Sequence, residues 1–208
     1  MKGEATRDRI KREARALFAA RGVDGVSIRE IVAATGQKNG ASLHYYFGSK
    51  ETLVRELVLD GAKLIDDRRN AWLDRLEGDG GPRTVRQAVE VLVWPSTSLG
   101  EGEGREGDYL RFISTLNMQN RELFDDILGD RWNSGYQRCL QHIRRHSNDG
   151  DPAALEQRLL FMSLSLRAVM TAREAALAAR PDHPLWSAPA TVEQLIDSLV
   201  AMIAVPAA

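Results

Sequence analysis

The 208-residue sequence contains a single cysteine, Cys139, and no apolar run of the ~20 residues that a bilayer-spanning helix needs. One cysteine excludes an internal disulfide and a CxxC metal pair. The net charge of −1 gives by itself no sign of a nucleic-acid partner. The first residues, Met1-Lys2-Gly3-Glu4, lead into a charged segment rather than an apolar signal segment. We therefore expect a globular, cytoplasmic protein with no membrane partner.

The sequence also lacks a convincing catalytic or metal-binding pattern. Gly102, Gly104 and Gly107 satisfy G-x-G-x-x-G, but no strand precedes them and the interspersed glutamates would repel a phosphate. We interpret residues 95–108 as a flexible loop. His142 and His146 have the spacing of paired metal ligands, but two arginines lie between them, which favours a solvated basic face. No catalytic residue, metal or cofactor is predicted, and the chain is not expected to be an enzyme.

The clearest local pattern is that of two short helices joined by a tight turn. Ser27 and Glu30 form a capping box, which predicts a helix start. Gly36 can end that helix because glycine adopts the left-handed conformation without steric cost. Leu43 and Phe47, an i,i+4 apolar pair, indicate a second short helix that ends before Gly48. Two such helices make a helix-turn-helix, which predicts DNA binding.

The second of these helices has an outward face suited to a major groove. At about 100° per residue, placing its two apolar residues inward turns Tyr45 and Ala41 outward. Ser42, His44 and Tyr46 lie on the flanks of that face. Apolar contact with a thymine methyl and hydrogen bonds to phosphate are the expected uses. Lys50, at the start of the third helix, adds a cation that favours phosphate.

The segments SIREIVAATG and LHYYFGSKETL resemble the TetR family of bacterial one-component transcription regulators, over roughly residues 6–60. The resemblance implies DNA contacts from the first helix of the motif, from the recognition helix and from positions next to the DNA backbone. These are, in that order, Ser27 and Arg29; Lys38, Asn39, Ala41, Ser42 and Tyr45; and His44, Tyr46 and Lys50. Two departures stand out: the turn between Gly36 and Leu43 is one residue longer than the common pattern, and His44 replaces a usual tyrosine.

Helical periodicity continues along the rest of the chain and predicts an all-α fold of about nine helices. Beyond the motif, helices are expected at residues 6–20, 49–76, 83–94, 109–117, 121–146 and 152–179, with a last one starting at a capping box of Thr191 and Gln194. Residues 1–49 are expected to form the DNA-binding domain, and residues 50–208 a helical domain for effector binding and dimerisation. The first 60 residues carry 11 Lys and Arg against 8 Asp and Glu, and the remainder 17 against 21. This weak asymmetry is compatible with such a division.

Residues 155–170 are apolar on almost every side, so we expect this helix to be buried on two sides. One side would face its own domain and the other a second subunit. The resemblance implies a four-helix bundle between the last two long helices of two copies, and a two-fold dimer can read two half-sites. The expected interface residues are Leu159, Met162, Leu166, Met170, Leu195, Leu199 and Ile203. Completion of the monomer core by the last helix remains an alternative.

The body also holds many large side chains, for which an ordinary core is the simple interpretation. The resemblance implies that these helices enclose a ligand cavity, and aromatic residues with Met suit an apolar guest. The candidate pocket residues are Trp72, Trp94, Arg111, Phe112, Met118, Trp132, Tyr136, Phe161 and Met162. Arg111 is a candidate partner for a ligand carboxylate. Cys139 is interpreted as a core residue, with an exposed redox thiol as the alternative.

The sequence therefore predicts a homodimeric regulator that binds an inverted repeat in double-stranded operator DNA. A repressor released by a small apolar or amphipathic effector is the leading hypothesis. Effector binding would favour a dimer whose long helices have swung and separated the recognition helices. The alternative is an effector-independent DNA-binding dimer whose body serves only for dimerisation or partner binding. A helical enzyme is disfavoured because no triad or carboxylate pair is present.

Overall fold

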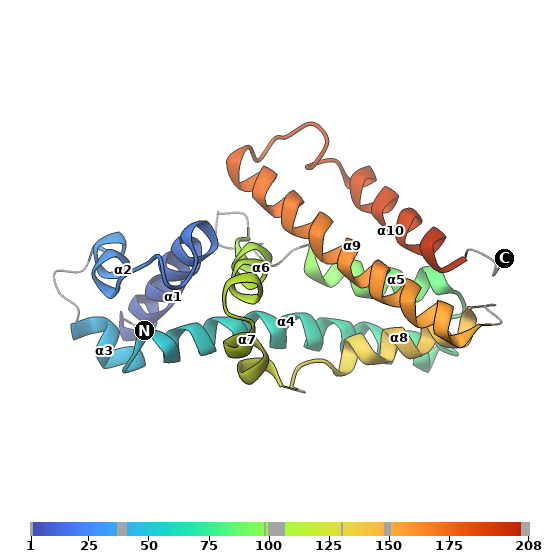
Figure 1. The fold of residues 1–208 in the computed structure, drawn as a ribbon, viewed down its shortest axis with the longest axis horizontal. Helices are drawn as coiled ribbons and strands as arrows, with labels where there is room; N and C mark the ends of the chain where they lie inside the picture. The colour runs from blue at the N-terminus through green and yellow to red at the C-terminus, as the bar shows by residue number, and fades with distance from the viewer. Residues whose placement is uncertain are drawn as a thin grey trace. The chain divides into compact units, whose positions relative to one another are not determined.

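The computed structural model describes residues 2–36, 41–97, 99, 107–129, 131–147 and 151–204. Within these residues the chain is helical and contains no strand, which confirms the all-α prediction (Figure 1). The helices are α1 (Lys2–Arg21), α2 (Ile28–Ala34), α3 (Ala41–Phe47), α4 (Lys50–Gly78), α5 (Val85–Val93), the short 3-10 helix η1 (Trp94–Ser96), α6 (Tyr109–Gln119), α7 (Arg121–Leu128), α8 (Ser134–His146), α9 (Pro152–Ala179) and α10 (Pro189–Ala204). No helix of the described residues is long and apolar enough to cross a membrane.

The chain divides into two compact units. The first unit combines residues 1–61 with residues 108–129, so α6 and α7 join the three N-terminal helices and the first part of α4. The second unit combines residues 62–107 with 130–208 and contains the remainder of α4 with α5 and α8–α10. The division into a DNA-binding domain at 1–49 and an effector domain at 50–208 is a functional one and stays a prediction.

One predicted helix is two helices in the structure. The periodicity of residues 121–146 predicts a single element, but α7 ends at Leu128 and α8 begins at Ser134. Gly129 follows α7 with φ of 47°, and Trp132 also has a positive φ of 56°. These conformations are incompatible with a continuous right-handed helix. The count therefore rises from about nine α-helices to ten among the described residues.

The start of α10 also differs from the prediction. The helix begins at Pro189, so Thr191 lies within its first turn rather than at the N-cap. The Thr191 hydroxyl donates to the carbonyl oxygen of Leu185 in the preceding loop. The predicted capping box of Thr191 with Gln194 is therefore wrong. By contrast, α9 begins at Pro152, as predicted, and the carboxylate of Asp151 accepts from the Ala153 N–H at 2.9 Å.

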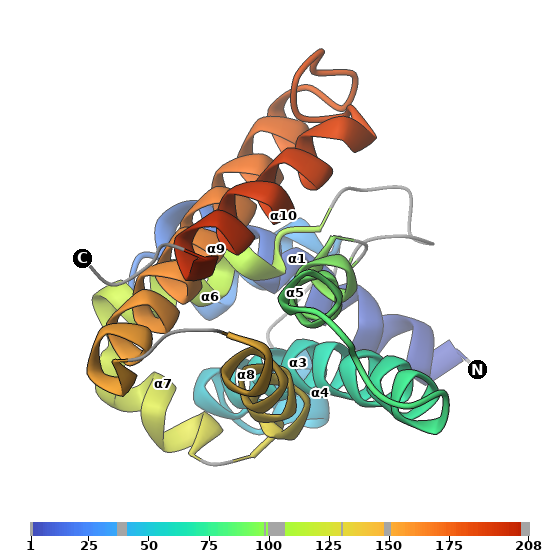
Figure 2. The same ribbon diagram turned by 90° about the vertical axis from the view of Figure 1, so that its right-hand side faces the viewer.

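The core of the second unit lies where α5 packs against α8 and α10, and α10 packs against α9 (Figure 2). The buried face of α8 consists of Gly135, Cys139, Leu140 and Ile143. Cys139 is fully buried, and burial raises the pKa of its thiol to about 12. A thiol that stays protonated and inaccessible is a core residue, so the alternative of an exposed redox thiol is excluded.

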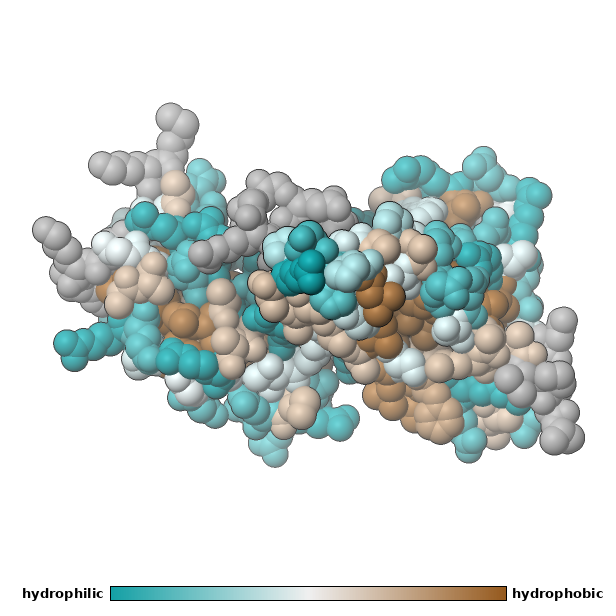
Figure 3. All heavy atoms as spheres, turned by 90° about the horizontal axis from the view of Figure 1, so that it is seen from above, coloured by the Kyte–Doolittle hydropathy of each residue, from teal (hydrophilic) through white to brown (hydrophobic). Residues whose placement is uncertain are grey.

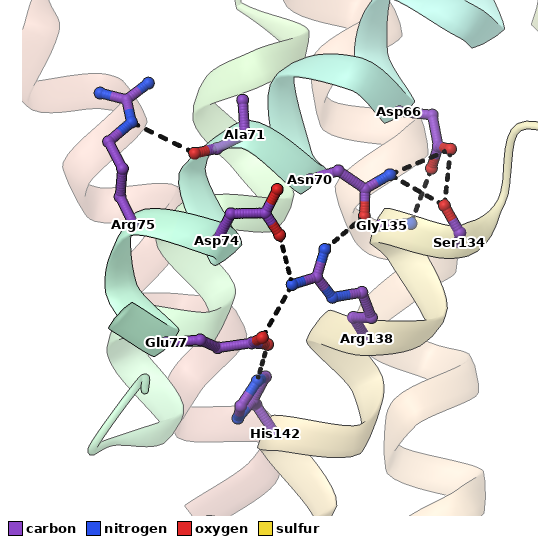
Figure 4. A network of polar contacts seen from close by, with 10 residues as sticks. All are labelled: Asp66, Asn70, Ala71, Asp74, Arg75, Glu77, Ser134, Gly135, Arg138 and His142. Carbon is purple, nitrogen blue, oxygen red and sulfur yellow. Dashed lines mark hydrogen bonds and ion pairs between the residues drawn. The ribbon is translucent and has the colours of Figure 1, made fainter. Parts of the chain in front are cut away.

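A polar stripe joins the C-terminal half of α4 to α8 (Figure 4). Arg138 donates to the amide oxygen of Asn70 at 2.7 Å and to the carboxylates of Asp74 and Glu77, each at 2.8 Å. His142 Nε2 lies 2.8 Å from the second oxygen of Glu77. The hydrogen bonds from His142 and then Arg138 lower the pKa of Glu77. The predicted solvated basic face around His142 is thus a hydrogen-bonded contact between two helices.

At the start of α8, the buried carboxylate of Asp66 replaces a conventional cap. It accepts from the Gly135 N–H at 2.7 Å and from the Ser134 hydroxyl at 2.9 Å. The N-cap residue Asn133 makes no capping hydrogen bond through its side chain. A Cβ on Gly135 would come within 2.7 Å of Arg69 Cβ, so only glycine allows this close approach. Asp66 thereby joins α8 to α4 and satisfies the N–H of Gly135 in the first turn of α8.

Replacement of Asp66 by alanine is expected to lower the free energy of unfolding by about 3 kcal/mol, because hydrogen bonds to a buried charged group contribute ~1.5–3 kcal/mol each. Urea titration measures this change. Asp67→Ala is the matched control, because Asp67 is exposed and pairs with exposed Lys63 on the same helix. That control should lose less than about 1 kcal/mol. Equal losses in both variants would contradict a capping role for Asp66.

The predicted dimer residues on α9 and α10 face the interior of their own chain. All seven are between 0% and 8% exposed, so they cannot form the surface that meets a second subunit: Leu159, Met162, Leu166, Met170, Leu195, Leu199 and Ile203. The exposed apolar residues of α9 are instead Leu160, Phe161 and Leu164, at 55%, 58% and 49%. The sequence prediction therefore assigned the inner face of α9 to the interface. Figure 3, which is seen from above Figure 1, shows apolar residues on the surface of the molecule.

Candidate nucleic-acid interface

The capping box at the start of α2 forms as predicted. The Ser27 N–H donates to Glu30 Oε2 at 2.8 Å, and the Glu30 N–H donates to Ser27 Oγ at 3.3 Å. Arg21 donates to the second carboxylate oxygen of Glu30 at 2.8 Å. The backbone hydrogen bond from Ser27, its hydroxyl and then Arg21 lower the pKa of Glu30 to about 2. This charged cap fixes where the helix-turn-helix begins.

The Glu30 cap should make stability depend on acid pH. A carboxyl group with a pKa lowered from 4.5 to about 2 stabilises the folded state above pH 4.5. That stabilisation is lost as the pH falls from 4.5 toward 2. A Glu30→Gln variant, which loses the charge, should melt below the wild type at pH 6 and approach it near pH 2.5. Calorimetric melting curves across this range test the expectation, with Glu122→Gln as the control for loss of one exposed carboxylate. A constant Tm difference would contradict it.

The glycines that follow α2 and α3 have the predicted left-handed conformation. Gly36 has φ of 68° and Gly48 has φ of 70°, the left-handed values that favour glycine after a helix. The Ser49 hydroxyl accepts from the Thr52 N–H at 3.0 Å and so caps the start of α4. At the C-terminal end of α3, the Gly48 N–H donates to the carbonyl oxygen of His44 at 2.9 Å, so local hydrogen bonds define where the helix ends.

Helix α3 turns its apolar pair inward and one aromatic ring outward. Leu43 and Phe47 are 0% and 4% exposed, whereas Tyr45 is 81% exposed. The ring of Tyr46 meets that of Tyr45 edge to face, with centroids 5.0 Å apart, which restricts the orientation of both. Ser42 is half-buried on the flank. An exposed, oriented aromatic ring on a short helix is suited to contact with base edges in a major groove.

His44 forms a hydrogen bond that the sequence did not predict. Its Nδ1 lies 2.8 Å from the carbonyl oxygen of Gly48. Because that oxygen can only accept, Nδ1 carries the proton and donates. The imidazole therefore closes the C-terminal end of α3 and retains Nε2 for a contact with DNA. Its predicted role next to the DNA backbone stays a prediction.

Lys50 also has partners within the protein. Its ammonium group donates to the carbonyl oxygens of Val23 and Val26, each at 3.0 Å. These bonds join the start of α4 to the turn between α1 and α2. Lys50 therefore holds the motif together, and a phosphate contact from the same ammonium group stays a prediction. No local sequence signal identified these two acceptors, because they lie more than 20 residues away.

The other predicted DNA contacts lie on the surface or outside the described residues. Ser27 and Arg29 are exposed at the start of α2. Lys38 and Asn39 lie outside the described residues, and for Ala41 the structure describes the backbone only. The motif therefore contributes exposed side chains from α2 and from α3.

Helices α1 and α6 pack together in the same unit as the helix-turn-helix. Lys11 on α1 forms ion pairs with Glu56 at 2.9 Å and Asp60 at 2.7 Å on α4. Phe18 stacks on Phe112 of α6 with centroids 6.0 Å apart, and both rings are fully buried. These contacts join α1 to α4 and α6 within the first unit, which also contains α2 and α3.

The candidate pocket residues are distributed over both units. Arg111, Phe112 and Met118 belong to the first unit, where Phe112 is a core residue and Met118 is 87% exposed. The remaining candidates belong to the second unit: Trp72, Trp94 and Tyr136 are half-buried, Met162 is buried, and Trp132 and Phe161 are exposed. The structure does not bring the nine residues together within one unit. The effector pocket stays a prediction.

The polar residues around Tyr136 were not identified from the sequence. The Tyr136 hydroxyl lies 2.6 Å from Ser163 Oγ on α9, and the Arg69 guanidinium lies over its ring at 5.9 Å. Arg69 also donates to the carbonyl oxygen of Leu92 at 2.8 Å, near the end of α5. Helical spacing could have placed these residues on inner faces but not opposite one another. Among the described residues, no group of three or more metal-ligating side chains occurs.

Comparisons with known proteins agree with this arrangement. Residues 10–57 match the family model for bacterial regulatory proteins of the tetR family. A solved protein from Shewanella sp. PV-4 assigned to the tetR family of transcription regulators has 16% identity and a TM-score of 0.63, over 96% of this chain and 98% of its own. The tetR-family regulatory protein from Rhodococcus RHA1 has 15% identity and a TM-score of 0.61, over 96% of this chain and 97% of its own. The TetR-family regulator PfmR from Thermus thermophilus has 20% identity and a TM-score of 0.56, over 94% of this chain and 97% of its own. The search of curated proteins finds no match.

A capped helix-turn-helix with an exposed second helix, followed by a larger helical body, is the arrangement of a DNA-binding transcription regulator. The match to the tetR-family model extends from α1 to the first turns of α4 and so covers the helix-turn-helix. The likeness of the whole chain to solved structures at 15–20% identity shows the shared fold.

Proposed function

We propose that the protein is a homodimeric repressor that leaves its operator when a small effector binds the helical body. The observation that carries the DNA-binding part is the outward face of α3, where Tyr45 is 81% exposed on a helix held by caps and buried apolar residues. An exposed helix of this kind can enter a major groove. Binding to chromosomal operators places the protein in the bacterial cytoplasm.

The exposed face of α9 supports dimerisation with a second copy. Large apolar residues, Leu160, Phe161 and Leu164, occupy the N-terminal half of this face. Small exposed residues, Ala168 and Ala172, follow in the C-terminal half. In an antiparallel pair of α9 helices, the large residues of one copy lie opposite the alanines of the other. A two-fold axis near the middle of α9 therefore gives close packing, as a symmetric dimer requires.

Effector control is proposed for the second unit because its interior combines aromatic rings with polar groups. Trp72, Trp94 and Tyr136 are half-buried there, and Tyr136 carries a hydroxyl within reach of Ser163. Aromatic walls with a few oriented polar groups are typical of sites for small amphipathic molecules. Release from DNA requires that the effector binds the DNA-incompetent conformation more tightly than the competent one.

Genomic DNA capture with the purified protein tests this proposal. Fragmented bacterial DNA is incubated with the immobilised chain, and the retained fragments are sequenced with and without a small-molecule cell extract. An enriched inverted repeat that the extract releases supports a ligand-responsive repressor. The same repeat retained under every extract favours the alternative, an effector-independent DNA-binding dimer. Absence of any enriched sequence contradicts operator recognition by the exposed face of α3.

A further inference from the structure

The exposed side chain of His44 has one ring nitrogen bound within the protein. Its Nδ1 lies 2.8 Å from the carbonyl oxygen of Gly48, which can only accept a hydrogen bond, so Nδ1 carries a proton. In the neutral ring the other nitrogen, Nε2, then has only a lone pair, and it can accept a hydrogen bond but not donate one. The hydrogen bond to Gly48 therefore determines what the second nitrogen can bind.

His44 lies on a flank of α3 rather than on its outward face. Leu43 and Phe47 form the buried side of this helix, and Tyr45 is exposed on the opposite side. His44 precedes Tyr45 by one residue and is therefore turned from it by about 100° around the helix axis. When a recognition helix lies in a major groove, its outward face meets the base edges and its flanks meet the sugar–phosphate backbones. The DNA groups next to His44 would thus be phosphate oxygens.

Phosphate oxygens accept hydrogen bonds and cannot donate them. A neutral His44 would present its Nε2 lone pair to another acceptor, and no hydrogen bond would form. The imidazolium form presents an N–H and a positive charge at Nε2, while Nδ1–H still donates to Gly48. The phosphate charge and the carbonyl oxygen at the C-terminal end of the helix both favour this cation. A tyrosine, which is usual at this position in the TetR family, would donate its hydroxyl without any change of charge.

The elements around α3 provide no carboxylate for His44 among the described residues. The titratable and charged groups next to α3 are Arg7 on α1, Arg29 and Glu30 on α2, Tyr45 and Tyr46 on α3 itself, and Lys50 and Glu51 at the start of α4. Both carboxylates have other partners, because Glu30 accepts from Arg21 at 2.8 Å and Glu51 accepts from Arg55 at 3.3 Å. The contact that stabilises an imidazolium at His44 is therefore left to the DNA.

We propose that His44 binds a DNA phosphate as the imidazolium, so that each bound chain takes up a proton from the solvent. The lone pair of Nε2 accepts this proton, and the new N–H donates to a phosphate oxygen. Because only the charged ring makes the contact, affinity for DNA is highest below about pH 6.5 and falls as the pH rises toward 8. This proton uptake rests on the proposed binding to DNA, and it needs neither repression nor an effector.

DNA affinity as a function of pH tests the proposal with the full-length protein. The probe is the inverted repeat retained in the genomic capture, or a mixed-sequence duplex of the same length if no repeat is enriched. Fluorescence anisotropy should show binding about tenfold weaker at pH 8 than at pH 6, because a charge-assisted hydrogen bond is lost. His44→Tyr, which offers a neutral donor, should change less than about twofold over the same range.

Calorimetry of DNA binding counts the protons directly. At pH 7.5, the heat of binding in buffers with different heats of ionisation should give an uptake between about half a proton and one proton per bound chain. His44→Tyr should take up close to none. His146→Tyr is the matched control, because His146 lies at the end of α8 in the second unit, and this variant should keep the wild-type uptake. The salt dependence provides a second measure, since the slope of log affinity against log salt should be steeper by about 0.9 at pH 6 than at pH 8.

Equal pH dependence in the wild type and in His44→Tyr would overturn the proposal and leave the proposed function intact. His44→Phe offers no donor, and a loss of affinity in this variant that is the same at pH 6 and pH 8 would show that His44 only closes the end of α3. A loss confined to particular base pairs, with no proton uptake, would show that a neutral His44 accepts from a base amino group. Both results would overturn the phosphate contact. Binding to neither duplex would overturn the proposed function together with this contact.

Discussion

A variant with both Leu160→Glu and Phe161→Glu is expected to be monomeric at micromolar concentration. A two-fold interface would lose four apolar side chains and gain four buried charges. Burial of one such side chain contributes about 1.5–3 kcal/mol, so most of the dimerisation free energy would be lost. Light scattering after size-exclusion chromatography measures the mass directly.

The same variant should bind an operator at least about 100-fold more weakly than the wild type, because a monomer reads only one half-site. Met118→Glu is the matched control, since Met118 is the most exposed of the large apolar residues in the described chain and lies on α6 rather than α9. Both its mass and its operator affinity should equal those of the wild type. A dimeric double variant would exclude the outer face of α9 as the interface.

A Tyr45→Ala variant is expected to lose about 10- to 100-fold in operator affinity, as expected for a groove contact that contributes ~1–3 kcal/mol. The free energy of unfolding should stay within about 0.5 kcal/mol of the wild type, because an exposed side chain contributes little to folding. Operator affinity is measured by fluorescence anisotropy on the captured repeat. Chemical denaturation provides the stability measurement.

Tyr45→Phe separates the ring from its hydroxyl. Apolar contact with a thymine methyl requires the ring only, so this variant should retain most of the affinity. A loss equal to that of Tyr45→Ala would instead assign the contact to the hydroxyl and to phosphate. Wild-type affinity in both variants would contradict the assignment of the outward face of α3 to the groove.

The helix-turn-helix could be predicted from the sequence because its signals are local. The capping box of Ser27 and Glu30 and the glycines after α2 and α3 each act within four residues. Helix caps and an i,i+4 apolar pair encode both the position of each helix and its inward face. The structure therefore agrees most closely with the sequence-based predictions in the described residues between 27 and 50.

Features that depend on distant residues could not be predicted in this way. The all-apolar pattern of α9 does not say which side faces the chain interior, so buried Leu159 was assigned to the dimer interface and exposed Leu160 was not. Lys50 finds its acceptors across the fold, and α8 receives its cap from Asp66 on another helix. The separation of α7 from α8 is marked by the positive φ angles of Gly129 and Trp132, in an otherwise helical pattern.

The first compact unit has a consequence for how such regulators can be recombined. Its core is built from two separate stretches of chain, because Phe18 of α1 stacks on Phe112 of α6. The 46 residues from 62 to 107, which separate these two stretches, belong to the second unit. A chimaera that exchanges only the N-terminal 61 residues would join α1 to a foreign α6. Operator specificity should therefore transfer between homologous proteins only when residues 108–129 are exchanged together with the N-terminal segment. The exchangeable unit is thus encoded by two separate parts of the gene.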